Sequence, residues 1–173
     1  MKKFVFLILF CIQICVSAET IYVLGEASIN NTYEEVKQGL SACEGVEVKK
    51  EIRGVVVSLE LENPKANYYH LTPELKKKLI CIEYFLAKIK NPVIIEVHTD
   101  KVPAGIKGKN WEFSSVIAGN IGDFFLKHKP AIPSDRVYLV GYGEFMPVIN
   151  TSNNGGNYSN RIDIIIRSSI DGE

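Results

Sequence analysis

The chain has little cysteine, no excess of either charge and, beyond its N-terminus, no long hydrophobic run. Only four of its 173 residues are cysteine. Two of these lie within residues 1–18, the segment expected to be removed, so a zinc site built from cysteines is not expected. Its 20 basic residues match its 20 acidic residues, and no basic stripe is present that could neutralise the phosphates of nucleic acid. These absences argue against nucleic-acid binding and leave a globular domain of ordinary composition.

The N-terminus has the pattern of a secretory signal peptide. Lys2 and Lys3 precede the apolar run 4–12, and small residues occur within 16–18. The run is shorter than the roughly 20 residues needed to cross a bilayer. We therefore expect cleavage after Ala18, export to the periplasm and no transmembrane span in the processed chain. An uncleaved membrane anchor is the alternative.

Two cysteines within residues 1–18 raise the possibility of a lipoprotein. Cys11 and Cys15 directly follow the bulky Phe10 and Ile14, whereas lipid attachment requires a small residue at that place. We therefore expect no lipid anchor. The remainder of the chain is long enough for one domain with a hydrophobic core.

Cys43 and Cys81 lie outside the signal peptide, in a chain expected to reach a compartment that permits disulfides. A disulfide between them would tie the first helix–strand junction to the following helix. From sequence we favour two small buried thiols instead, because pairing depends on geometry that the sequence does not give.

The first part of the chain predicts a short helix and then a β-hairpin. Residues 19–44 form a lead-in segment, in which Thr32 is expected to cap the helix. Apolar residues alternate over 55–61, and Arg53-Gly54 marks the turn that precedes them. This alternation is typical of a half-buried antiparallel hairpin.

Residue spacing predicts two further helices and three strands. Thr72-Pro73 begins the helix expected to be the longest, which ends at Asn91-Pro92. The second helix is predicted over 111–127. The predicted strands are 93–97, 137–140 and 162–166. The predicted inner stripes of the helices are Leu75, Leu79, Ile82, Leu86 and Ile89, and Phe113, Ile117, Ile121 and Phe124. We therefore expect an α+β two-layer sandwich over 45–173, with helices packed on one face of a mixed β-sheet.

Three motifs in the second half of the chain occur in a recognisable order. They are His98-Thr99-Asp100, Gly141-Tyr142-Gly143-Glu144 with Pro147, and Asn160-Arg161. With them, the stretch from Gly45 to Ile166 resembles the OmpA/MotB C-terminal (OmpA-like) domain family. The resemblance implies a β/α/β/α/β fold and a non-catalytic periplasmic domain that binds the peptide stem of peptidoglycan. The glycines of the second motif are expected where the chain turns, with Tyr142 packed beneath.

The resemblance also implies which residues bind the ligand. The family's acidic residue falls on Asp100, which could accept charge-assisted hydrogen bonds from an ammonium group of the stem. Thr99, Asn110 and Arg161 are the other ligand-binding residues expected. Asn110 could also cap the following helix, and Arg161 would contact either the stem's terminal carboxylate or a neighbouring loop. Alternatively, Asp100 caps its own loop through the backbone.

The sequence departs from the family pattern at three positions that usually carry arginine. They are Ile117, Gly156 and Ile162. Because isoleucine donates no hydrogen bond, the carboxylate of a diaminopimelate stem would lose its bidentate partner at Ile117. We therefore expect a stem that presents only an ammonium group, such as ornithine or lysine, or else a domain that has drifted from wall binding.

No enzyme, cofactor or metal site is expected. Ser114 or Ser115 could be grouped with His98 and Asp100 as a catalytic triad, but no nucleophile elbow surrounds either serine. His98 and Asp100 lack a third metal ligand at suitable spacing, and His98 is expected to brace a loop. Trp111 either offers a flat face to a ligand or is buried against the loop.

Together, these patterns predict a periplasmic, non-enzymatic module associated with the cell wall or the outer membrane, with peptidoglycan as its partner. A flagellar stator role is not expected, because the apolar N-terminal run lacks the aspartate that the MotB family carries in its transmembrane helix. The alternative is an OmpA-like module that has lost peptidoglycan binding. It would contact an envelope protein through a sheet edge or an exposed loop.

Overall fold

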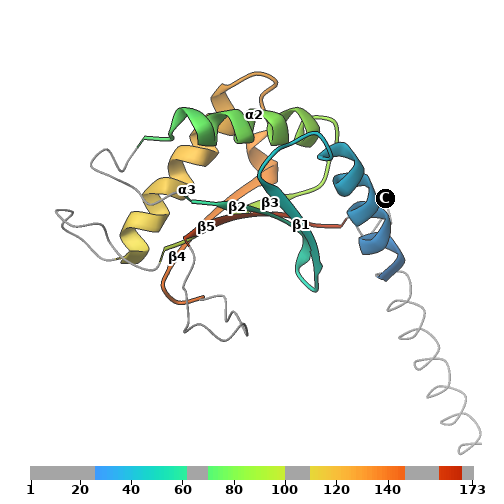
Figure 1. Cartoon of the computed structure of the whole chain (residues 1–173), viewed down its shortest axis with the longest axis horizontal. Coiled ribbons are helices and arrows are strands. Elements are labelled where there is room, and N and C mark those ends of the chain that lie inside the picture. The colour runs from blue at the N-terminus through green and yellow to red at the C-terminus, as the bar shows by residue number, and fades with distance from the viewer. Residues whose placement is uncertain (1–25, 62–69, 100–109, 147–159, 169–173) are drawn as a thin grey trace, which may run out of the picture.

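A mixed five-stranded sheet with helices against one face forms the domain (Figure 1). The computed structural model describes residues 26–61, 70–99, 110–146 and 160–168. In chain order the elements are a helix over residues 26–39, β1 (Val46–Glu51), β2 (Gly54–Glu60), α2 (Pro73–Leu86), β3 (Val93–His98), α3 (Asn110–Lys127), a short 3-10 helix (Ser134–Arg136), β4 (Val137–Gly143) and β5 (Arg161–Ile166). The predicted two-layer α+β architecture is confirmed.

The order of strands in the sheet is β1-β2-β5-β3-β4. The last strand, β5, is inserted between β2 and β3 and is antiparallel to both, whereas β3 and β4 pair in parallel. Strand β5 is therefore central, and residues Ile162–Ile166 are all buried. Strands β1 and β4 form the two edges of the sheet.

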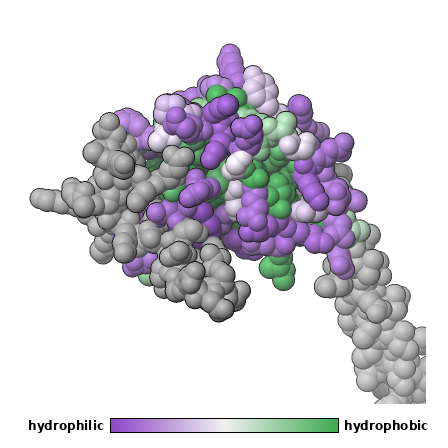
Figure 2. All heavy atoms as spheres, in the orientation of Figure 1, coloured by the Kyte–Doolittle hydropathy of each residue, from purple (hydrophilic) through white to green (hydrophobic). Residues whose placement is uncertain are grey.

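The helix-facing side of the sheet is built from three aligned rows of aliphatic residues. The strand register gives the rows Val55, Ile166 and Val93; Val57, Ile164 and Ile95; and Leu59, Ile162 and Val97. Each of these side chains is at most 1% exposed. Figure 2 shows a largely hydrophilic outer surface over the described residues in that view. The core is thus the layer between this face and the helices.

Helix α2 begins and packs as its sequence predicts. The Thr72 hydroxyl accepts a hydrogen bond from the Leu75 amide at 3.1 Å, which caps the first turn. Its predicted inner residues are buried, although Ile89 lies beyond the helix end. The prediction that this helix is the longest is wrong, because α3 has 18 residues and α2 has 14. On α3 the deeply buried position is Phe125, not Phe124.

The helix over residues 26–39 differs from the expected short lead-in. Thr32 lies within it and donates its hydroxyl hydrogen bond to the Ser28 carbonyl at 3.0 Å, so the predicted capping role is wrong. Val36 and Leu40 are buried in the same core as the sheet, which packs this segment with the domain. The predicted domain boundaries stay a prediction. None of the helices in the described ranges has the length and hydropathy to span a membrane.

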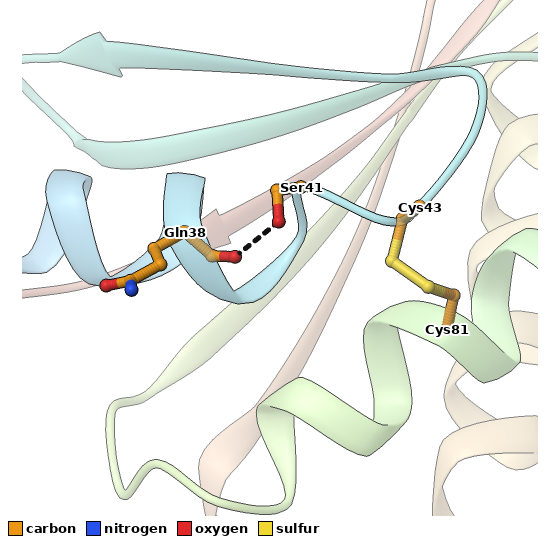
Figure 3. The surroundings of a disulfide bond; sticks show 4 residues. All are labelled: Gln38, Ser41, Cys43 and Cys81. Atoms are coloured by element: carbon orange, nitrogen blue, oxygen red, sulfur yellow. Dashed lines mark hydrogen bonds between the residues drawn. A yellow bond between two sulfur atoms is a disulfide. The ribbon is translucent and has the colours of Figure 1, made fainter.

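Cys43 and Cys81 form a disulfide (Figure 3). Their Cα atoms are 5.9 Å apart, within the usual range for such bonds. The bond joins the segment between the 26–39 helix and β1 to the middle of α2. The sequence-based preference for two free thiols is therefore wrong, because folding brings together positions that are 38 residues apart. Nearby, the Ser41 hydroxyl donates to the Gln38 carbonyl at 2.8 Å.

We expect the double substitution Cys43→Ser with Cys81→Ser to lower the free energy of unfolding by about 4 kcal/mol. A cross-link over this separation removes conformational entropy from the unfolded chain by roughly that amount. Urea denaturation of both proteins, with and without a reducing agent, measures the difference. A wild-type midpoint that does not move on reduction would contradict the role given to this disulfide.

A buried acid joins the two long helices. Glu83 of α2 is fully buried and contacts the His128 ring just beyond α3, while its second carboxylate oxygen has no partner among the described residues. Burial raises the pKa of Glu83 and outweighs the lowering by His128. A group whose pKa is raised by folding stabilises the fold at low pH and loses that contribution as the pH rises through the raised value.

Substituting Glu83→Gln should therefore change how stability depends on pH. We expect the variant to gain stability relative to the wild type as the pH rises above 4.5, the ordinary pKa of the glutamate side chain. Thermal unfolding of both proteins between pH 4 and roughly pH 8 measures this difference. The other carboxylates titrate in both proteins, so their contribution cancels in the comparison. Glu35→Gln, at an exposed position, is the matched control. A stability difference independent of pH would refute the assignment.

Candidate functional site

The C-terminal end of β3 is tied to the first residue of α3. The Thr99 hydroxyl donates a hydrogen bond to the Asn110 side-chain oxygen, and the Asn110 amide group donates to the Thr99 carbonyl at 2.8 Å. The Thr99 amide also donates to the Gly143 carbonyl at 3.0 Å. Thr99 is 2% exposed. We call this set of hydrogen bonds the Thr99–Asn110 clamp; it fixes the backbone one residue before Asp100.

Two glycines let α3 approach β4 closely at this end of the sheet. A side chain at Gly141 would lie 2.3 Å from the Ser115 amide nitrogen, and Gly143 has a positive φ of 55°. The Ser114 hydroxyl accepts a hydrogen bond from the Gly143 amide at 2.9 Å. The expectation that these glycines lie where the chain turns holds for Gly143, which ends the strand with a positive φ directly before a turn. It is wrong for Gly141, which lies within the strand and serves a close helix–strand contact.

Of the predicted ligand-binding residues, the structure brings Thr99 and Asn110 together. Asn110 is the first residue of α3, and its side chain binds Thr99, so it fastens the helix to the strand. Asp100 and Gly156 lie outside the described residues. Trp111 is 44% exposed, which favours an open aromatic face over the buried alternative.

Two of the positions where the family pattern has arginine belong to the hydrophobic core. Ile117 is 4% exposed and Ile162 is fully buried, and both pack in the layer between the helices and the sheet. An arginine at Ile162 would place a charge among aliphatic side chains without a partner. The isoleucine there therefore fills the core. Because position 162 faces the helices, its side chain does not affect the charge on the opposite face of the sheet.

Arg161 points away from the core, because it alternates with Ile162 along β5. Its Nε donates to the Asp163 carboxylate at 2.8 Å, and its Nη2 donates to the Met146 carbonyl at 3.2 Å. Of the two roles expected for Arg161, the structure favours contact with a neighbouring loop. The arginine holds the end of β5 to the segment that follows β4.

The face of the sheet opposite the helices carries a buried polar group that the sequence motifs did not indicate. Strand register aligns Ser58, Asp163 and Glu96 in one row, with His98 next to them in the following row. Glu96, His98 and Asp163 are each at most 4% exposed. Alternation along 93–98 places Glu96 with His98, but only the pairing of β5 with β3 could reveal Asp163 beside them.

This polar group contains a histidine between two acids. The His98 Nε2 atom lies 3.5 Å from a carboxylate oxygen of Glu96 and 3.5 Å from one of Asp163. The ring stacks on Tyr142, with centroids 5.1 Å apart. His98 therefore lies within the sheet, whereas the sequence led us to expect that it braces a loop.

Two arginines bind the acids: Arg161 donates to Asp163, as described above, and Arg53 donates to Glu96. Arg53, in the β1–β2 turn, donates through Nη1 to Glu96 and through Nε and Nη2 to Glu51. Burial alone would raise the pKa of Glu96, but His98 and Arg53 lower it below its usual value. The pKa of Tyr142 is raised, first by burial and then by the negative charge of Glu96. The geometry and these shifts describe Glu96 as a charged carboxylate inside the sheet.

Several solved structures share this fold. A MotB-like protein from Desulfovibrio vulgaris superposes with a TM-score of 0.71 at 21% identity, over 87% of this chain and 99% of that one. The cell wall anchor of the T6SS from Pseudomonas aeruginosa gives a TM-score of 0.63 at 20% identity, over 78% and 97%. An outer membrane protein from Borrelia burgdorferi B31 gives 0.53 at 26% identity, over 70% and 96%.

Sequence comparison agrees with the fold. The uncharacterised protein YtxE of Bacillus subtilis is 32% identical over 91 residues, which are 51% of this chain. The match spans only 37% of the length of that relative. Residues 65–161, more than half of the chain, match the model of the OmpA family. The resemblance noted from the motifs is thus confirmed, and the chain belongs to the OmpA family.

Proposed function

We propose that this protein binds peptidoglycan through the peptide stem, with Asp100 as the acceptor for an ammonium group of the stem. Membership of the OmpA family supports the proposal, as does the shared fold with a protein described as the cell wall anchor of the T6SS. The observation that carries it is the Thr99–Asn110 clamp. A binding carboxylate needs a backbone that is fixed before the ligand arrives, and the clamp fixes the residue next to Asp100.

The location of the clamp suits a charged ligand. It joins the end of β3 to the N-terminus of the 18-residue helix α3, where the helix dipole favours negative charge, including that of an ionised aspartate. An ionised carboxylate and an ammonium group form charge-assisted hydrogen bonds, which are stronger than neutral ones. Thr99 and Asn110 act in this proposal by positioning Asp100. Trp111, partly exposed on the first turn of α3, offers an apolar face beside them.

The stem we propose carries an amine and no carboxylate at the recognised residue, as ornithine and lysine do. Ile117, at the position of the family's arginine, is buried in the core and offers no hydrogen-bond donor. Arg161 already donates to Asp163 and to the Met146 carbonyl. A stem carboxylate would thus lose water at these positions without gaining a bidentate partner.

The same proposal places the protein in the periplasm. The signal peptide predicted over residues 1–18 lies outside the described residues, and its cleavage after Ala18 stays a prediction. The Cys43–Cys81 disulfide fits a compartment that permits oxidation. We propose no catalytic role, and an association with the outer membrane would follow from contact with the wall.

Sedimentation with purified sacculi tests the role of Asp100. We expect the wild-type protein to sediment with sacculi that carry lysine or ornithine, and Asp100→Ala to weaken binding about tenfold to 100-fold, the loss of a hydrogen bond to a charged group. Asp135→Ala is the matched control, because this exposed aspartate lies at the opposite end of the β3–β4 pair. Equal binding by Asp100→Ala and the wild type would refute the role of Asp100.

The choice of stem is tested separately with sacculi of different chemistry. We expect stronger retention on lysine or ornithine sacculi than on diaminopimelate sacculi. Ile117 offers no donor to the carboxylate at the free end of diaminopimelate, and Arg161 already donates to Asp163 and to the Met146 carbonyl. Preference for diaminopimelate would overturn the proposed selectivity while leaving peptidoglycan binding intact. Retention on none of the three would instead favour the rival function, a protein-interaction module without wall binding.

A further inference from the structure

We propose that Glu96, His98 and Asp163 form a binding site for a divalent transition metal, and that zinc fits it best. The site lies within the face of the sheet opposite the helices. Glu96 and His98 are two residues apart on β3 and share one face, while Asp163 is the direct partner of Glu96 on β5. One ligand atom from each of the three residues lies within 4.8 Å of the other two.

The two distances from His98 to the carboxylates fit tetrahedral coordination. Zinc holds nitrogen and oxygen ligands at about 2.0 to 2.2 Å, so two ligands of a tetrahedral ion lie roughly 3.3 to 3.6 Å apart. The His98 Nε2 atom is 3.5 Å from the nearest oxygen of Glu96 and of Asp163. One histidine and two carboxylates are also a donor set that zinc accepts. A single ion could therefore bind all three side chains with small movements.

The surroundings of His98 support a metal site independently. The residue is 2% exposed, and neither of its ring nitrogens makes a hydrogen bond within the described residues. A buried polar nitrogen without a partner destabilises the fold. Its Nε2 atom faces the two carboxylates at a separation that is long for a hydrogen bond and suitable for a shared metal.

Hydrogen bonds from neighbouring groups already hold the Asp163 carboxylate in place. Ser58 donates to one oxygen of Asp163 at 2.8 Å, and Arg161 donates to the other, also at 2.8 Å. The His98 ring is held flat against Tyr142. Metal sites depend on such outer contacts to orient their ligands. These contacts would keep Asp163 and His98 aimed at the ion.

Arg161 donates to the Asp163 oxygen that faces His98, so it competes with a metal for that oxygen. At Glu96 the competing group is Arg53. Its Nη1 donates to Glu96, whereas its Nε and Nη2 donate to Glu51 at 3.1 and 2.9 Å. The Arg53 side chain is 31% exposed, so it can turn away from Glu96 and keep both hydrogen bonds to Glu51. This movement would free the Glu96 oxygen and remove a positive charge from the site. Removing the Arg53 side chain should therefore raise the metal affinity, whereas removing the His98 side chain should lower it.

Metal titration of the full-length protein, after removal of metal with a chelator, tests the proposal. We expect one equivalent of Zn²⁺ to bind and to raise the melting temperature. Co²⁺ used as a probe should give the intense visible absorption of a tetrahedral ion. His98→Ala should weaken Zn²⁺ binding at least about 100-fold, since a zinc site with three protein ligands would lose one of them. Arg53→Gln should strengthen it about tenfold, because a cation next to the ion is removed.

The matched control is His128→Ala. That histidine also contacts a buried glutamate, but belongs to no group of three possible ligands in the described ranges. Zn²⁺ affinity should stay unchanged in this variant. Absence of Zn²⁺ binding by the wild type, or equal binding by His98→Ala, would overturn the proposal. If His98→Ala does not fold, the effect of Arg53→Gln and the Co²⁺ spectrum decide. Peptidoglycan binding is measured separately, so either proposal can fail alone.

Discussion

The insertion of β5 between β2 and β3 is the constraint on which the rest of the structure depends. This pairing aligns the aliphatic rows of three strands under the helices, and the alternation of side chains then sends the intervening residues to the other face. A shift of β5 by one residue would exchange the two faces. It would move Ile162 and Ile164 to the face that carries His98 and place Arg161 and Asp163 in the aliphatic core. One register therefore sets both the core and the polar group around His98.

The candidate wall-binding site depends on a second, local constraint. Strand β3 ends and helix α3 begins at residues that bind each other's side chains, Thr99 and Asn110. The close approach of α3 to β4 requires glycine at 141 and is reinforced by the hydrogen bond between Ser114 and Gly143. These contacts make the end of the sheet rigid where the proposed ligand binds. The same strand carries Glu96 and His98 on the face opposite the helices, so the two proposed sites share β3.

Sequence patterns predicted the fold well where local periodicity determines it. The start of α2 at Thr72-Pro73, the hairpin and the buried stripes of the helices follow from hydrophobic spacing and the preference of proline for the first helical position. Features that depend on contacts between distant segments could not be predicted. The Cys43–Cys81 disulfide needs the position of α2 against the segment before β1, and Asp163 reaches His98 only through strand pairing. Likewise, a motif comparison could mark Ile162 as a lost arginine, but only the register shows that this position faces the core.

In the proposed complex, the Asp100 carboxylate binds a free amine of the peptide stem. This contact can be measured by calorimetric titration of the protein with two soluble stem peptides. In one peptide the side chain of the third residue carries a free amine, and in the other that amine is acetylated. We expect the peptide with the free amine to bind and the acetylated peptide to have at least about a tenfold weaker affinity, because acetylation removes the charge that the carboxylate recognises. Equal affinity for the two peptides would contradict it.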